Sequence, residues 1–180
     1  IQEQITKQEN LIRDLLNVSK IQSGMTDYQD EEFNLDNLVK MTVKELEATA
    51  PTHAIVIFGK TTHKIRAIKE HIGQVLTNFL TNAIKYSPDA KKVIVRLSEN
   101  KNHAMVKVED FGMGIPKEET KRVFDRFYRG ENVKTKALSG YGLGLYIASQ
   151  IIKQSGGQIK VESVEGKGST FSFSLPISEQ

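Results

Sequence analysis

The 180-residue chain contains no cysteine, no tryptophan and only four prolines. The absence of cysteine excludes a disulfide framework, a cysteine-ligated zinc site, an iron–sulfur cluster and a cysteine nucleophile. No apolar run approaches the ~20 residues that a membrane-spanning helix needs, and the first residues lack the pattern of a signal peptide. An ordinary hydrophobic core must therefore hold the chain together.

Neither sign of charge dominates the sequence. Lysine and arginine number 25 against 22 aspartates and glutamates, which gives a net charge of +3 with the charges interspersed. Such a balance is too mild to predict a nucleic-acid-binding surface. The length suits a single domain with one core. Because the chain begins at Ile1 rather than at methionine, we expect it to be a fragment or a processed product.

Hydrophobic periodicity divides the chain into alternating elements. Helices are predicted at residues 1–23, 38–48, 68–87 and 143–154, with a partly helical stretch at 118–127. Strands are predicted at residues 33–35, 54–58, 64–67, 92–98, 105–108, 158–164 and 169–175. Because most of the strands are joined by hairpins, we expect an α+β fold in which helices cover one face of a sheet.

The predicted helix over residues 1–23 carries an apolar stripe that includes Ile5, Ile12 and Leu15. Such a stripe needs a partner surface. The partner is either the rest of the same domain or a helical bundle of which this helix is a truncated part, and the pattern leaves both interpretations open.

The predicted helix over residues 68–87 has a polar stripe made by Asn78, Asn82 and Lys85, which are spaced by four and three residues. Two amide oxygens and an ammonium group in a row could hold a hard metal ion and the phosphates that it neutralises. The alternative is an ordinary solvated helix face.

Asp110, Gly112 and Gly114 follow directly after a predicted apolar strand. A carboxylate at a strand end, beside backbone that can take φ > 0, suits the recognition of a flat polar ligand. The alternative is a turn capped by the aspartate. Residues 110–112 also spell the Asp-Phe-Gly of eukaryotic-type protein kinases, but the chain lacks the strand lysine and the His-Arg-Asp loop of those enzymes, which excludes that class.

Gly140, Gly142 and Gly144 alternate immediately before a predicted helix. Glycines in this position expose backbone N–H groups to an anion, and the helix dipole adds to the attraction. Leu145 stands where a dinucleotide fingerprint needs its last glycine, and no Walker A motif occurs in the chain. The segment is therefore either a phosphate-binding loop of another type or simply a flexible loop.

Taken together and in this order, the motifs resemble the ATP-binding catalytic domain of sensor histidine kinases, within the gyrase–Hsp90–histidine kinase–MutL superfamily. The resemblance covers about residues 30–177. Its five boxes are an N box, a first glycine box, an F box, a second glycine box and a third glycine box, at residues 78–87, 110–114, 124–129, 140–145 and 166–171.

Residues 11–24 are similar to the end of the second dimerisation helix of the same kinases. The resemblance implies that residues 1–26 are the truncated end of the dimerisation domain, and that residues 27–180 form a two-layer α/β sandwich of the Bergerat type. In these kinases the phosphoacceptor histidine is followed by Glu or Asp. None of the four histidines of this chain has such a neighbour. The chain thus resembles a kinase that lacks its own substrate histidine.

The resemblance implies roles for particular residues. Asn82 would coordinate Mg²⁺ on the phosphates of ATP with Asn78 in support, and Lys85 and Arg129 would neutralise phosphate charge. Tyr86 would lie along the adenine, and Asp110 would accept a hydrogen bond from the 6-amino group of the adenine. Residues 132–139 would form an ATP lid. The implied catalytic residues are Asn78, Lys85 and Arg129. The implied nucleotide-binding set is Asn78, Asn82, Lys85, Tyr86, Asp110, Gly112, Gly114, Ile115, Phe127, Arg129, Gly140, Tyr141, Gly142, Leu143, Gly144, Leu145 and Thr170.

The implied function is transfer of the γ-phosphate of Mg-ATP to a histidine on the absent dimerisation helix, for relay to the receiver domain of a response regulator. The parent protein would be a homodimer, and this domain would be cytoplasmic even if membrane segments outside this chain anchor the parent. No nucleic-acid partner is expected. Two rivals are an ATPase or serine kinase of the same superfamily and a non-catalytic nucleotide-binding module. Asn78 argues against the ATPase, because hydrolysing members place a glutamate there and asparagine cannot act as a general base.

Overall fold

The computed structural model describes residues 29–49, 52–131 and 140–178, together with four separate helical residues, Gln8, Ile12, Leu16 and Ser19. Most of the predicted helix over residues 1–23 and all of the predicted lid over residues 132–139 lie outside the described residues. In the part of the chain that is described, no helix is both long enough and apolar enough to cross a membrane.

Most of the predicted elements are present with small shifts at their ends. The helices are α2 (Leu35–Thr49), α3 (Lys69–Lys85) and α5 (Gly144–Gln154). The strands are β1 (Glu31–Asn34), β2 (Ala54–Gly59), β3 (Lys64–Ala67), β4 (Lys92–Glu99), β5 (His103–Glu109), β6 (Gln158–Val164) and β7 (Gly168–Pro176).

Two local expectations are wrong. Leu35 begins α2 instead of ending the first strand, because Asn34 accepts a hydrogen bond from the Asn37 N–H through its Oδ1 and so caps the helix. Residues 118–127 form consecutive turns instead of a partial helix. Backbone bonds such as Arg122 N–H to Glu119 O and Asp125 N–H to Arg122 O span three residues. The Thr120 N–H bond to the Pro116 carbonyl spans four, but it does not continue into an α-helical ladder in this segment.

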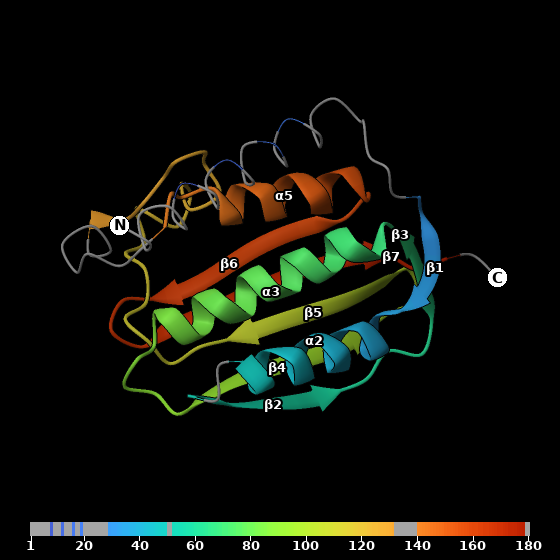
Figure 1. The fold of residues 1–180 in the computed structure, drawn as a ribbon, viewed down its shortest axis with the longest axis horizontal. Helices are drawn as coiled ribbons and strands as arrows, with labels where there is room; N and C mark the ends of the chain where they lie inside the picture. The colour runs from blue at the N-terminus through green and yellow to red at the C-terminus, as the bar shows by residue number, and fades with distance from the viewer. Residues whose placement is uncertain are drawn as a thin grey trace.

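The main sheet has five strands in the order β2-β4-β5-β7-β6, while β1 and β3 form a separate antiparallel pair. β2 runs parallel to β4, and all the other neighbours in the main sheet are antiparallel. Helices α2, α3 and α5 lie side by side across one face of this sheet (Figure 1). The architecture confirms the α+β prediction of a mixed sheet covered by helices on one face.

The core lies between the three helices and the covered face of the sheet. On β5, Ala104, Val106 and Val108 are buried while the alternate residues are partly exposed, which is the period of a half-buried strand. Phe79 of α3 is completely buried, with its ring 5.5 Å from that of Phe171 and 6.1 Å from that of Phe173. These contacts fix α3 against β7, and the polar face of α3 consequently lies beside the ends of β5 and β7.

Candidate functional site

A cavity of about 380 Å³ opens between α3, the start of α5 and the adjoining ends of β5 and β7. This volume falls in the range of small-molecule sites. Of the residues that the resemblance implies, the following line it: Asn78, Asn82, Lys85, Tyr86, Asp110, Gly114, Ile115, Arg129, Gly140, Tyr141, Gly142, Leu143, Gly144 and Leu145. Four separate stretches of the sequence, from α3, the end of β5, the segment around Arg129 and the start of α5, therefore meet at one site.

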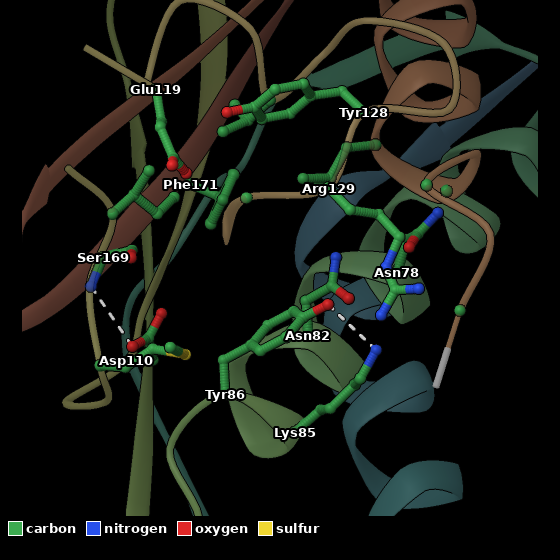
Figure 2. A pocket seen from close by; sticks show the side chains of 18 of the residues that line it. Asn78, Asn82, Lys85, Tyr86, Asp110, Glu119, Tyr128, Arg129, Ser169 and Phe171 are labelled. Carbon is green, nitrogen blue, oxygen red and sulfur yellow. Dashed lines mark hydrogen bonds between the residues drawn. The ribbon is translucent and has the colours of Figure 1, made fainter. Parts of the chain in front are cut away.

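One end of the cavity is formed by the polar face of α3, and Figure 2 shows Asn78, Asn82 and Lys85 projecting from this helix. The Lys85 Nζ donates a hydrogen bond to the Tyr86 hydroxyl at 3.0 Å and lies 4.6 Å from the centre of its ring. In the same view the Arg129 side chain points toward α3. Two cationic side chains and two amides at one end of a cavity suit a polyanionic ligand.

The second glycine box brings the start of α5 against this end. Gly142 has a φ of +71°, and an added Cβ would lie 2.5 Å from the Tyr128 carbonyl oxygen, so only glycine fits there. Its own carbonyl accepts the Phe127 N–H at 3.0 Å. The backbone that carries Arg129 is thus tied to the loop that opens α5.

Asp110 marks the opposite end of the cavity, at the end of β5. Asp110 is buried, with only 5% of the residue's surface exposed. Its Oδ1 accepts hydrogen bonds from the Gly112 N–H at 2.9 Å and the Ser169 N–H at 3.3 Å. Burial raises the pKa of Asp110, and these two bonds oppose that rise. Figure 2 shows its other carboxylate oxygen turned toward the cavity, where it can accept a hydrogen bond from a ligand.

Three residues of the implied set do not line the cavity. Gly112 packs against backbone instead, since an added Cβ would lie 2.1 Å from the Tyr86 carbonyl oxygen. Phe127 has a φ of +62° and is 52% exposed, and its ring stacks under the Arg126 guanidinium at 4.9 Å. Thr170 lies on the other face of β7 from its buried neighbour Phe171.

Other lining residues were not identified from the sequence: Met113, Pro116, Glu119, Val123, Tyr128, Gly130, Ser169 and Phe171. Ser169 could have been found, because the alternation of Phe171 and Phe173 toward the core places Ser169 on the same face of β7. Glu119 carries no such signal. Its Oε1 accepts the Glu131 N–H at 3.3 Å across a loop that the sequence pattern does not predict.

The cavity offers amide oxygens, rather than a cluster of acidic side chains, as ligands for a metal ion. Within the described residues, no group of three or more His, Cys, Asp or Glu side chains could hold a metal ion. An amide oxygen such as that of Asn82 is a suitable hard ligand, and Mg²⁺ in nucleotide sites takes most of its ligands from phosphates and water. The site therefore fits a magnesium ion that arrives with a phosphate ligand.

Comparison with known proteins gives a consistent result. The family model described as "Histidine kinase-, DNA gyrase B-, and HSP90-like ATPase" matches residues 67–179. Over 94% of its length, the chain is 35% identical to the sensor histidine kinase WalK of Bacillus subtilis and 29% identical to the signal transduction histidine-protein kinase ArlS of Staphylococcus haemolyticus. It spans only 28% of WalK and 38% of ArlS.

Solved structures of similar fold are also available. The mycobacterial sensor histidine kinase MprB superposes with a TM-score of 0.72 at 26% identity, covering 83% of this chain and 99% of that one. The catalytic domain of histidine kinase ThkA gives a TM-score of 0.69 at 26% identity, covering 84% of this chain and 99% of that one.

Proposed function

Because the chain belongs to the family of histidine kinase-, DNA gyrase B- and HSP90-like ATPases, we propose that its cavity binds Mg-ATP and that the chain is the catalytic domain of a protein-histidine kinase. The observation that carries the proposal is the meeting of the α3 stripe, Asp110 and the glycine-rich start of α5 around one cavity. The relatives named above, all histidine kinases, support the choice among the functions of the family.

In this proposal the two ends of the cavity bind different parts of ATP. Lys85 and Arg129 neutralise the phosphates, while Asp110 accepts a hydrogen bond from the 6-amino group of adenine and Tyr86 lies along the base. Asn82 would hold Mg²⁺ with Asn78 in support, and the bound ion would supply charge neutralisation for phosphoryl transfer. Phosphoryl transfer needs mainly positioning and electrostatic stabilisation, and this cavity offers both.

Asn78 supports transfer over hydrolysis. In the hydrolysing relatives of the superfamily a glutamate stands one turn before the magnesium asparagine and activates water. Here that position is Asn78, whose amide cannot take a proton at neutral pH. Its Oδ1 would lie 2.4 Å from a Cβ at Gly144, so the amide packs tightly against the start of α5. Without a carboxylate at this position, the site favours keeping ATP for a protein acceptor.

The acceptor in this proposal is a histidine on the dimerisation helix of the same or a partner subunit in a homodimeric parent, and a receiver domain of a response regulator is the next partner. We assign residues 1–26 to the end of that helical domain and residues 27–180 to the catalytic domain in the cytoplasm. The helical residues Ile12 and Leu16 are 58% and 57% exposed, and this uncovered apolar pair suits a helix that packs on another helix.

The test supplies the parent's phosphoacceptor helical domain in trans with γ-labelled ATP and follows the label. We expect acid-labile, base-stable label on a histidine of that domain, and little release of free phosphate. Asn82→Ala should abolish the label, while Asn102→Ala, an exposed asparagine in the β4–β5 turn, serves as the matched control and should not. Rapid release of phosphate without protein label would support the ATPase alternative instead.

A further inference from the structure

Ser163 of β6 lies outside the cavity but is joined to it by hydrogen bonds. It is paired with Ser169 across the β6–β7 ladder, and the two Oγ atoms are 2.9 Å apart. Ser163 Oγ also donates to the Gly168 carbonyl at 2.9 Å and accepts the Ile115 N–H at 2.8 Å. Ser169 and Ile115 both line the cavity, whereas Ser163 does not.

The direction of each of these hydrogen bonds follows from the number of protons and lone pairs that each group has. A serine hydroxyl has one proton and two acceptor lone pairs. The Gly168 carbonyl can only accept, so the Ser163 proton points to it. Ser163 Oγ then has only lone pairs left, and the Ile115 N–H takes one of them. The bond between the two serines consequently runs from the Ser169 hydroxyl to Ser163.

This orientation determines what Ser169 can offer a ligand. Its single proton is used on Ser163, so toward the cavity the Ser169 Oγ can only accept a hydrogen bond. The neighbouring group is the Asp110 carboxylate, whose Oδ1 accepts the Ser169 N–H and whose other oxygen faces the cavity. This end of the cavity therefore presents acceptors, and it complements a ligand edge that carries a donor.

We propose that Ser163 is a positioning residue for nucleotide specificity: it holds the Ser169 hydroxyl as an acceptor and so favours a purine with a 6-amino group over one with a 6-carbonyl group. The inference rests on the proposed binding of ATP and deepens it. Ser163 acts through Ser169 and has no direct contact with the ligand in this assignment.

The test compares the affinities of the chain for ATP and for inosine triphosphate, which carries a carbonyl at position 6, by titration calorimetry. The wild type should prefer ATP. Ser163→Ala frees the Ser169 proton to act as a donor, and the ratio of the two affinities should fall about three- to tenfold, the worth of one ordinary hydrogen bond. Ser163→Thr keeps the hydroxyl and should keep the ratio. Ser172→Ala, on the other face of β7, is the matched control and should also keep it.

A double-mutant cycle isolates the mechanism from a general loss of packing. In a Ser169→Ala background there is no hydroxyl to orient, so adding Ser163→Ala should leave the ratio unchanged. If Ser163→Ala does not fold, Ser163→Cys, with a thiol that accepts poorly, should give the same fall in the ratio. A wild-type preference that Ser163→Ala or Ser163→Cys retains would overturn this inference alone. A wild-type chain that binds neither nucleotide would overturn the proposed function as well.

Discussion

Asp110→Asn changes one functional atom in the cavity and leaves the shape of the side chain almost unchanged. The amide oxygen of the variant can still accept the Gly112 and Ser169 N–H groups that Oδ1 accepts in the wild type, at 2.9 and 3.3 Å. The amide nitrogen then replaces the oxygen that faces the cavity. A donor would meet the 6-amino donor of adenine, and both would lack an acceptor.

The size of the effect follows from the cost of a buried unpaired polar group. This cost is about 1–3 kcal/mol, so the affinity for ATP should fall about five- to 150-fold. Thermal stability near neutral pH should be maintained or rise slightly. Burial raises the folded-state pKa of Asp110 above the ordinary value of 3.8, so stability falls as the pH rises from the ordinary pKa through the raised one, and the neutral amide removes this cost.

Calorimetric titration with ATP, beside a thermal unfolding scan, measures both effects. Asp125→Asn is the matched control, because Asp125 is an exposed aspartate whose ion pair with Arg122, at 3.8 Å, is worth little. The wild type should also lose affinity for ATP on acidification, at a pH above that at which an ordinary aspartate titrates. Equal ATP affinity in the wild type and in Asp110→Asn would refute the role assigned to Asp110.

Three further predictions concern other parts of the molecule. Asn82→Ala should remove the Mg²⁺-dependent part of ATP binding, and titrations with and without EDTA on a variant with a wild-type unfolding temperature check this. Gly144→Ala should keep the fold, since alanine is the better helix former, but its Cβ would displace the Asn78 amide, 2.4 Å away, so phosphoryl transfer should fall at least tenfold. Hydrogen bonds, chiefly from the Thr62 hydroxyl, lower the pKa of Glu99 from 4.5 to about 2. The wild type should therefore lose stability as the pH falls through this range, and acid unfolding curves of Glu99→Gln should show a smaller loss.

The sequence was sufficient to predict the elements that carry regular periodicity. The alternation of Val93, Val95 and Leu97 predicts β4, and the apolar face of α3 predicts both the helix and the direction of its polar stripe. The turns at residues 118–127 have no comparable repeat, and one end of the segment is bonded to a distant loop, through the Phe127 N–H and the Gly142 carbonyl. Periodicity therefore predicts the regular helices and strands, whereas segments without a repeat take a shape that the sequence pattern does not predict.

Two site residues show why the loops and strand faces were harder. Phe127 belongs to a motif, but its positive φ turns the ring outward, and a bulky residue in the left-handed region cannot be foreseen from sequence because the surrounding fold imposes it. The resemblance implies a site role for Thr170, whereas its neighbour Ser169 lines the cavity. In a strand, a change of one residue moves the side chain to the opposite face.

The position of β7 has a consequence for how the cavity is assembled. Among the described strands β7 comes last in the sequence, yet it lies between β5 and β6 and supplies Ser169 and Phe171 to the cavity. Of the described strands, β7 alone pairs with β6, so β6 joins the main sheet only when β7 has inserted beside β5. A folding intermediate without β7 in place therefore lacks one wall of the proposed nucleotide site. Binding competence consequently reports on completion of the sheet, and a ligand of this cavity should select molecules in which β7 is already paired.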